Sequence, residues 1–341
     1  MRVMIMAAGK GTRLRPVTDL IPKPMAPIVN RPALYHILGL LRRHGFREVI
    51  INLHHLSDSI RTHFGDGTAM GMEISYSYEP ELMGTAGGVK NNADFLGRET
   101  FLVMSGDALT DIDLTGLVAA HQRHGSIATM SVKEVADPSL YGVVVADDDD
   151  RVVGFQEKPT IEEARSRLCN CGIYVFEPEI LSHIPAGEFD DFGTRLLPDL
   201  LRQQVLYHIY PVDEYWNDVG NLKELVQGNS DALHGQVSVE IPGNEIRPGV
   251  WVDEGTLLPT SVRVEPPVAI GRNCVIGEDV VVEGPTAIGE GCVVGAQAHL
   301  ARTILLGDAR IPAGALLVEG IVAGQPEIGE RDSSVGGVRT Q

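Results

Sequence analysis

Residues 262–300 read VRVEPPVAIGRNCVIGEDVVVEGPTAIGEGCVVGAQAHL, which divides into groups of six whose first and third residues are apolar or small. The period extends in both directions, because an aliphatic residue recurs at every sixth position, at Ile246, Val252, Leu258, Val264, Ile270, Ile276, Val282, Ile288, Val294, Leu300 and Leu306. Repeats of this length stack short parallel strands into a three-sided β-helix, with one coil for every three groups. The sequence therefore predicts about three to four coils. We expect the array to end at Arg310, a charged residue at an inward position.

The first two thirds of the chain follow a different pattern. Up to about residue 235, apolar strand-like runs, such as those at 3–7, 101–105 and 171–176, alternate with amphipathic helical stretches. This alternation predicts an α/β fold with a Rossmann-like, mostly parallel sheet, which binds ligands at the carboxyl ends of its strands. A chain of 341 residues is also too long for one ordinary core. We expect an α/β domain at 1–235, a hexapeptide-repeat parallel β-helix at 245–322 and a mobile tail at 323–341.

Composition narrows the possible partners. The net charge of −18 argues against nucleic acid and against anionic membranes, since both require a basic surface. No apolar run approaches the roughly 18 residues that cross a bilayer, and the N-terminus lacks the cleavage site of a secretory signal. The four cysteines form neither a disulfide framework nor a zinc-binding spacing. We therefore expect a cytoplasmic protein with free thiols. If its ligands are anionic phosphates, they must bind through a few local Lys and Arg residues and a divalent cation.

A glycine-rich loop follows the first predicted strand, with the sequence AAGKGTRLRP at residues 7–16. It lacks the third glycine of a dinucleotide fingerprint, because Leu14 stands there, and it lacks the Gly-Lys-Ser/Thr of a P-loop. Gly9 and Gly11 still allow backbone N–H groups to turn toward phosphate oxygens, and Lys10, Arg13 and Lys23 can neutralise charge. The loop by itself is compatible with a phosphate cradle or with a tight turn.

Further segments follow this loop in order along residues 1–235: Pro22-Lys23-Pro24-Met25, Gly84-Thr85-Ala86-Gly87, Ser105-Gly106-Asp107, Tyr141-Gly142-Val143, Glu157-Lys158-Pro159, Asn170-Cys171-Gly172-Ile173-Tyr174, Asp191-Phe192-Gly193 and Trp216-Asn217-Asp218-Val219-Gly220. With the loop, they resemble the signature of the sugar-1-phosphate nucleotidyltransferase family. Among its branches the pattern is most similar to mannose-1-phosphate guanylyltransferases, which also carry a C-terminal left-handed β-helix. Cys171 stands where the family often has alanine, which leaves the branch open.

The resemblance implies a role for each matching residue. It assigns nucleotide binding to Ala8, Gly9, Gly11, Thr12, Arg13, Lys23, Gly84, Thr85, Ala86 and Asp107. It assigns the sugar phosphate to Tyr141, Gly142, Glu157, Lys158 and Asn170. Asp107 and Asp218 correspond to the family's pair of metal carboxylates, and oxygen ligands of this kind suit Mg²⁺. The residues expected to carry the catalysis are Arg13, Lys23, Asp107, Lys158 and Asp218.

The expected reaction is an in-line attack of a sugar 1-phosphate on the α-phosphorus of a nucleoside triphosphate. The motifs favour GTP and mannose 1-phosphate; thymidylyl, uridylyl or adenylyl transfer to glucose 1-phosphate stays open. A bifunctional uridylyl- and acetyltransferase would need a longer array and a catalytic histidine, whereas His299 stands at an outward position. A non-catalytic subunit with the same fold is the alternative of another class. We also expect a homo-oligomer, because a stack of coils offers a broad rigid surface.

Overall fold

The computed structural model describes residues 1–324 and 335–339. Contacts divide the chain into two compact units, of which the first comprises Met1–Lys10 with Ile37–Asp218, and the second Gly11–His36 with Val219–Gln341. The division therefore passes through the glycine-rich loop, between Lys10 and Gly11. No helix in the described part of the chain has both the length and the apolar character needed to span a membrane.

The first unit is built on a mixed sheet with the strand order β10-β9-β11-β6-β1-β4-β5, in which β8 pairs with β11 and β12. Its core strands β1, β4 and β6 are parallel and almost wholly buried, as is usual for a sheet covered on both faces. The strands are β1 Val3–Met6, β4 Glu48–Leu53, β5 Glu73–Tyr78, β6 Phe101–Ser105, β8 Ala128–Glu134, β9 Gly142–Ala146, β10 Val152–Glu157, β11 Leu168–Phe176 and β12 His208–Pro211. The predicted α/β class is confirmed.

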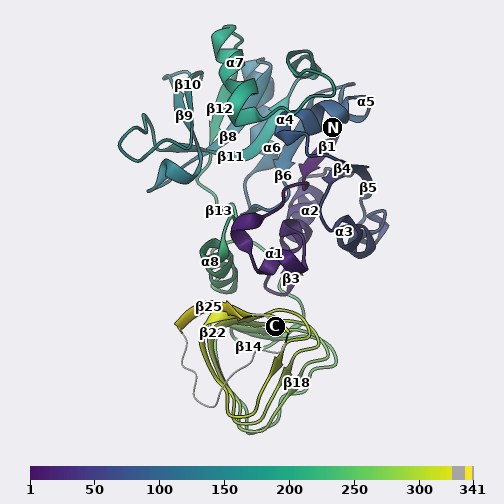
Figure 1. The fold of residues 1–341 in the computed structure, drawn as a ribbon, viewed down its shortest axis with the longest axis vertical. Coiled ribbons are helices and arrows are strands. Elements are labelled where there is room, and N and C mark those ends of the chain that lie inside the picture. The colour runs from purple at the N-terminus through teal and green to yellow at the C-terminus, as the bar shows by residue number, and fades with distance from the viewer. Residues whose placement is uncertain (325–334, 340–341) are drawn as a thin grey trace. The chain divides into compact units, whose positions relative to one another are not determined.

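Helices of the first unit follow the strands as the sequence pattern indicates (Figure 1). Helix α6 shows how local sequence sets their ends: Asp113 accepts a hydrogen bond from the Gly116 N–H, and Gly125 stops the helix with a φ of 60°. Helix α2 (Ala33–Arg43) begins in the second unit and continues into the first at Ile37. The other helices are α3 Ser57–Phe64, α4 Gly84–Asn91, α5 Ala93–Leu96, α6 Leu114–His124 and α7 Leu197–Arg202. Helix α7 directly follows η6, a π-helical turn at Phe192–Leu196.

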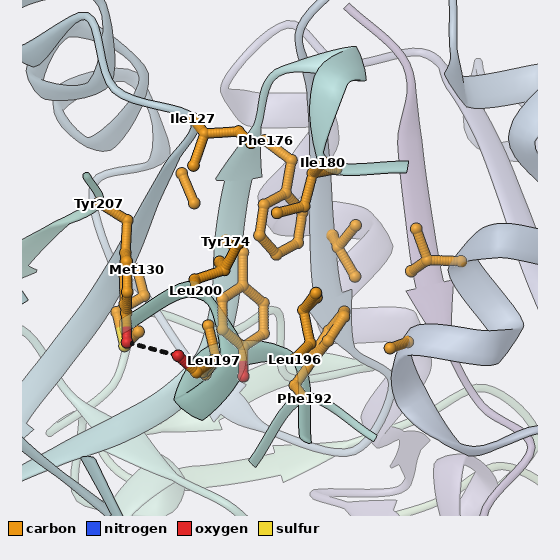
Figure 2. Close-up of a cluster of buried hydrophobic side chains, with 14 of the residues drawn as sticks. Ile127, Met130, Tyr174, Phe176, Ile180, Phe192, Leu196, Leu197, Leu200 and Tyr207 are labelled. Atoms are coloured by element: carbon orange, nitrogen blue, oxygen red, sulfur yellow. Dashed lines mark hydrogen bonds between the residues drawn. The ribbon is translucent and has the colours of Figure 1, made fainter. Parts of the chain in front are cut away.

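An aromatic cluster fills the core between the sheet and the η6–α7 segment. Figure 2 shows Tyr174 and Phe176 of β11 beside Phe192, with Leu196, Leu197 and Leu200 packed around them. The rings of Tyr174 and Phe192 meet edge to face with 4.9 Å between centroids, a favourable arrangement for aromatic pairs. The buried Tyr207 hydroxyl donates a hydrogen bond of 3.1 Å to the Leu197 carbonyl. This packing fixes η6, whose N-terminal end belongs to the candidate site.

The second unit contains α1 (Val17–Leu20), the hairpin β2 (Pro27–Ile28) and β3 (Arg31–Pro32), α8 (Leu222–Leu233) and a parallel β-helix. Strand β14 (Asn244–Arg247) precedes the coils and pairs antiparallel with β15. The β-helix strands are β15 Val250–Val252, β16 Arg263–Glu265, β17 Val268–Ile270, β18 Val275–Ile276, β19 Val281–Glu283, β20 Thr286–Ile288, β21 Val293–Val294, β22 His299–Leu305, β23 Arg310–Ile311, β24 Leu316–Val322 and β25 Val335–Arg339. Parallel pairing of successive coils confirms the predicted hexapeptide architecture.

The last part of the array departs from the predicted register. Early coils contain 18 residues, as the hydrogen bond between Cys274 and Thr256 shows, whereas Thr303 bonds to Thr286 across 17 residues. One residue is lost between Leu300 and Leu305, so Leu305 rather than Leu306 occupies the aliphatic position opposite Ile288. The expectation that the array ends at an inward Arg310 is therefore wrong. Arg310 pairs with Val293 and is exposed, and its buried neighbour Ala309 points inward.

Strands continue beyond the predicted end of the array. Strand β24 pairs in parallel with β22, and β25 pairs in parallel with β24. Of the tail at 323–341, residues 325–334 and 340–341 lie outside the described residues. The sequence did not predict β25.

Three histidines in the first unit lead to a prediction about pH. Burial lowers the pKa of His44, His121 and His208; for His208, the neighbouring His124 and Arg151 add to the effect, against Asp147 and Asp150. The rings of His208 and His124 stack with centroids 4.2 Å apart, and neither Nδ1 has a hydrogen-bond partner among the described residues.

We expect the free energy of unfolding to fall as the pH drops below about 6.5, because the unfolded chain then binds protons that the folded chain takes up only at lower pH. The fall should end once the lowered pKa values have been passed. His208→Phe keeps an aromatic ring beside His124. In this variant the slope of the free energy of unfolding against pH should be shallower by the contribution of one histidine. Urea titrations from about pH 8 to about pH 5 measure this slope. A slope in His208→Phe equal to that of the unchanged protein would contradict the prediction.

Candidate active site

The carboxyl ends of β1 and β6 bring two of the sequence motifs side by side. Met6 pairs with Ser105 at the end of these parallel strands, and the Gly106 N–H donates a hydrogen bond of 2.8 Å to the Met6 carbonyl. A Cβ at Gly106 would lie 2.9 Å from that oxygen, which explains the glycine. The Ser105 hydroxyl donates to the Asp107 carboxylate. The start of the glycine-rich loop and Asp107 therefore share one edge of the sheet, where ligands of α/β folds bind.

Asp107 and Asp218 approach through a short ribbon of two antiparallel strands, β7 (Leu109–Thr110) and β13 (Trp216–Asn217). Asn217 of β13 pairs with Leu109 of β7. Because the two strands are antiparallel, Asp218, which follows Asn217, lies at the same end of the ribbon as Ala108 and Asp107, which precede Leu109. Both aspartates are partly buried. Two carboxylates that are far apart in sequence thus come to the same end of the ribbon.

A buried amide and carboxylate, which the sequence analysis missed, join the glycine-rich loop to the segment before α4. Asn52 Oδ1 accepts from the Ala7 N–H at 2.7 Å, and its Nδ2 donates to Glu79 Oε1 at 2.7 Å. Glu79 Oε2 in turn accepts from the Met83 N–H at 3.2 Å. Both side chains are buried, so these bonds form where water cannot replace them. The only signal in the sequence is a polar residue near the end of each strand, Asn52 in the apolar β4 and Glu79 directly after β5, which alternates polar and apolar residues.

We expect Asn52→Leu to weaken triphosphate binding, because the Ala7 N–H and the Glu79 carboxylate would lose their partner. A buried polar group without a partner costs about 1–3 kcal/mol, so the melting temperature should also fall. Steady-state kinetics should show a larger increase in KM for the triphosphate than for the sugar phosphate. Asn92→Leu, at a buried asparagine that bonds to the Gly88 carbonyl, is the matched control. A similar kinetic change in both variants would contradict a positioning role for Asn52.

The Gly84-Thr85-Ala86 segment is held by the residues that lead into η6. The N–H groups of Ala86 and Gly87 both donate to the Asp190 carbonyl at 3.0 Å. Thr85 donates its hydroxyl proton to Asp191 at 2.9 Å and accepts from the Phe192 N–H at 2.8 Å. The Ala86 amide, which the resemblance assigns to the nucleotide, is therefore engaged within the protein.

The buried Asp190 anchors this arrangement through Arg195. Arg195 Nε donates to Asp190 Oδ1 at 2.6 Å, and its terminal nitrogens bind Asp190 and Asp199. The hydrogen bond that Arg195 donates to Asp190 raises the pKa of Arg195, so its guanidinium stays charged. A bidentate pair of this kind fixes orientation as well as charge.

The residues assigned to the sugar phosphate come together on the hairpin of β9 and β10. Gly142 pairs with Glu157, and the Lys158 N–H donates to the Tyr141 carbonyl at 3.1 Å. The Lys158 ammonium contacts Glu157 Oε1 at 2.6 Å. Lys158 has a φ of 46°, a left-handed conformation that is uncommon for a residue other than glycine and that concentrates at functional sites.

Asn170 borders the same hairpin at a bulge in β11. The bulge lies between Asn170 and Tyr174, where Asn170 Nδ2 donates to the Tyr174 hydroxyl at 2.6 Å and Oδ1 accepts from the Gly172 N–H at 2.9 Å. Burial raises the pKa of Tyr174, so its phenol remains protonated at neutral pH. The Trp216 ring packs on Tyr141 with 5.1 Å between centroids, and its Nε1–H donates to the Cys171 carbonyl.

The rest of the glycine-rich loop belongs to the second unit. Gly11 has a φ of 62°, and a Cβ there would lie 2.9 Å from side-chain atoms of Thr18 and Lys23. The Thr18 hydroxyl donates to the Gly11 carbonyl at 2.8 Å. Thr12 and Arg13 lie in the exposed part of the following 3-10 turn, Thr12–Leu14, and Lys23 begins another, Lys23–Met25. Glycine at position 11 lets the Lys23 stem pack directly on the loop backbone.

Within residues 1–324 and 335–339 there is no group of three or more His, Cys, Asp and Glu residues that could hold a metal ion. Asp107 and Asp218 are two carboxylates and form no such group. Two carboxylates suit Mg²⁺, which takes one or two from the protein and its remaining ligands from substrate phosphates and water.

Comparison with known proteins gives consistent similarities. The model of the nucleotidyl transferase family matches residues 2–235, and that of the bacterial transferase hexapeptide (six repeats) matches residues 267–302. A UTP–glucose-1-phosphate uridylyltransferase of Synechocystis sp. is 39% identical over 340 residues, covering 95% of this chain and 88% of that protein. A mannose-1-phosphate guanylyltransferase of Mycobacterium tuberculosis is 33% identical over 77% of this chain and 76% of its own length. The crystal structure of HddC from Yersinia pseudotuberculosis, complexed with GMP-PN, is 26% identical with a TM-score of 0.59, covering 68% of this chain and 99% of that one.

Proposed function

Because the chain belongs to the nucleotidyl transferase family, we propose that it transfers the uridylyl group of UTP to glucose 1-phosphate and releases pyrophosphate. Nucleotidyl transfer to a sugar 1-phosphate follows from the family, and the choice of substrates rests on one observation. The Synechocystis uridylyltransferase is similar over both the α/β region and the repeats, with 39% identity across 95% of the chain. This supports the alternative left open by the sequence motifs over their first choice, GTP with mannose 1-phosphate.

Guanylyl transfer to mannose 1-phosphate is the second candidate. It is favoured by the motif pattern and by the guanylyltransferase of Mycobacterium tuberculosis, which is similar at 33% identity over 77% of the chain.

The reaction requires that the two substrates be aligned, and it requires no general base. The attacking oxygen of a sugar phosphate is already ionised near neutral pH, and the attack expels pyrophosphate from the α-phosphorus. The protein must hold two anions in line and stabilise charge on the transferring and leaving groups. We assign the sugar phosphate to Lys158 and the triphosphate to Arg13 and Lys23. These local cations offset the unfavourable field of a chain with net charge −18.

Asp107 and Asp218 would hold Mg²⁺, which when bound neutralises charge on phosphate oxygens. Their oxygen ligands and their common position at the end of the β7–β13 ribbon fit this ion. The Ser105 hydroxyl, which donates to Asp107, would fix the orientation of that carboxylate.

A substrate panel tests the proposal. Pyrophosphate release is measured with UTP, GTP, dTTP and ATP, each with glucose 1-phosphate and with mannose 1-phosphate, in the presence of Mg²⁺. We expect the highest kcat/KM for UTP with glucose 1-phosphate. A higher value for GTP with mannose 1-phosphate would establish the second candidate instead. No turnover with any pair would support the non-catalytic alternative.

A further inference from the structure

A cavity of about 550 Å³ lies within the second unit, between α8 and one flat face of the β-helix. Its walls are apolar on both sides, with Leu222, Val226 and Leu233 from the helix and Ala287, Ile304 and Ile321 from the coils. The volume is within the range of about 300–1,000 Å³ that is typical of small-molecule sites. None of the residues assigned to the substrates lines it.

The coil side of this cavity is an apolar ladder that faces away from the β-helix interior. Ala287 pairs with Ile304, and Ile304 with Ile321, one on each successive coil. Their neighbours Ile288, Leu305 and Val322 belong to the interior cluster of the β-helix. The outward ladder is nevertheless buried. The small side chain of Ala287 leaves room where the ladder faces α8.

The helix side is rigid. Asn229, in the wall of the cavity, accepts from the Val29 N–H at 2.8 Å and donates to the Pro27 and Leu225 carbonyls at 2.9 Å. The amide therefore ties α8 to the β2–β3 hairpin of the same unit. Gln227 is likewise held by Asp231 at 2.7 Å. Walls fixed in this way make the cavity preformed, which lowers the entropic cost of binding.

Charge at the rim results from the shortening of the coils. In one coil, the corner between two strands contains Gly284 and Pro285. In the next coil, the same corner contains only Arg302. Glu319 lies 17 residues beyond Arg302, at the corner of the following coil. Arg302 and Glu319 form an ion pair of 2.9 Å. Lys223 contributes a second cation from α8, with no ion pair or hydrogen bond among the described residues. The rim thus carries one positive charge in excess.

We propose that this cavity binds an amphipathic monoanion, a small molecule with an apolar body and a single acidic group. The apolar walls would take the body, whose burial is favourable because it removes apolar surface from water. Lys223 would pair with the acidic group at the rim. Nucleoside triphosphates and sugar phosphates fit poorly here, because the rim has one excess positive charge and the Gln227 and Asn229 amides in the wall are already hydrogen-bonded within the protein. The site is independent of the proposed function.

The test uses the fluorescence of 1-anilinonaphthalene-8-sulfonate, an amphipathic monoanion, titrated with the full chain. We expect saturable binding that decanoate displaces and decanol displaces much less effectively. Ala287→Trp, which fills the cavity, should abolish binding. Lys223→Glu should weaken it about tenfold, since an attraction becomes a repulsion. Arg263→Glu reverses an exposed charge on another face of the β-helix and should bind like the unchanged protein.

Several results would overturn the proposal. Absence of saturable binding, or equal affinity in the unchanged protein, Lys223→Glu and Ala287→Trp, would show that the cavity is not the site. If decanol displaced the dye as effectively as decanoate, the site would not require an acidic group in its ligand. Circular dichroism establishes whether Ala287→Trp folds. If Ala287→Trp does not fold, the binding measured for Lys223→Glu tests the proposal by itself. Lys223 is exposed, so its replacement should not disturb folding.

Discussion

Replacing Asp218 by asparagine is expected to lower kcat by about three orders of magnitude, while the melting temperature changes by no more than about 2 °C. The amide keeps the size of the carboxylate but removes one of the two negative charges assigned to Mg²⁺, and charge stabilisation by such an ion is worth several kcal/mol. Each 1.36 kcal/mol corresponds to a factor of ten in rate. The next residue, Val219, has a φ of 43°, rare for a β-branched side chain. Such strain is typical of functional positions.

Asp148→Asn is the matched control, because it makes the same change of charge at an exposed turn between β9 and β10. Its kcat should equal that of the unchanged protein. Steady-state kinetics at several Mg²⁺ concentrations separate the possible causes. An Asp218→Asn enzyme that reaches the normal rate at high Mg²⁺ would have lost only metal affinity. Normal activity of Asp218→Asn at all Mg²⁺ concentrations would show that Asp218 is not part of the site.

The fold was predictable where one periodicity dominates. The period of six gave the β-helix, and strand β6 has the predicted bounds of 101–105. The loss of one residue between Leu300 and Leu305 could not be seen, because Leu305 and Leu306 are both leucine and either can continue the period. Arg310 then seemed to point inward, although the shortened coil turns it to solvent. A repeat defined by apolarity alone does not fix its register where apolar residues are adjacent.

The candidate site was predictable where motifs carry it. The motif residues that lie in the first unit come from strand ends, from turns, from β11 and from the start of α4, and pairing of β1 with β6 and of β9 with β10 brings several of them together. The bonds that position them could not be predicted. Asn52 and Glu79 meet only because β4 and β5 pair in parallel, and Asp190 bonds to α4 across a long separation in sequence. Polar contacts of this kind depend on tertiary structure, which a local pattern does not contain.

Lys158→Met is expected to raise KM for the sugar 1-phosphate by about a hundredfold, with KM for the triphosphate nearly unchanged. Methionine keeps the length and apolar stem of lysine and removes the ammonium that we assign to the sugar phosphate. Charge-assisted contacts with phosphate are roughly twice as strong as neutral hydrogen bonds, so their loss is felt most by the substrate that makes them. In the structure this ammonium contacts Glu157, and Lys158 has a left-handed backbone at the end of the β9–β10 hairpin.

The two KM values distinguish this role from a structural one. Arg167→Met removes a cation from the exposed segment just before β11 and should change neither KM. If Lys158 merely supported the hairpin by its contact with Glu157, Lys158→Met would lower the melting temperature and raise both KM values together. If Lys158 binds the phosphate, the melting temperature should stay nearly unchanged and only the KM for the sugar 1-phosphate should rise.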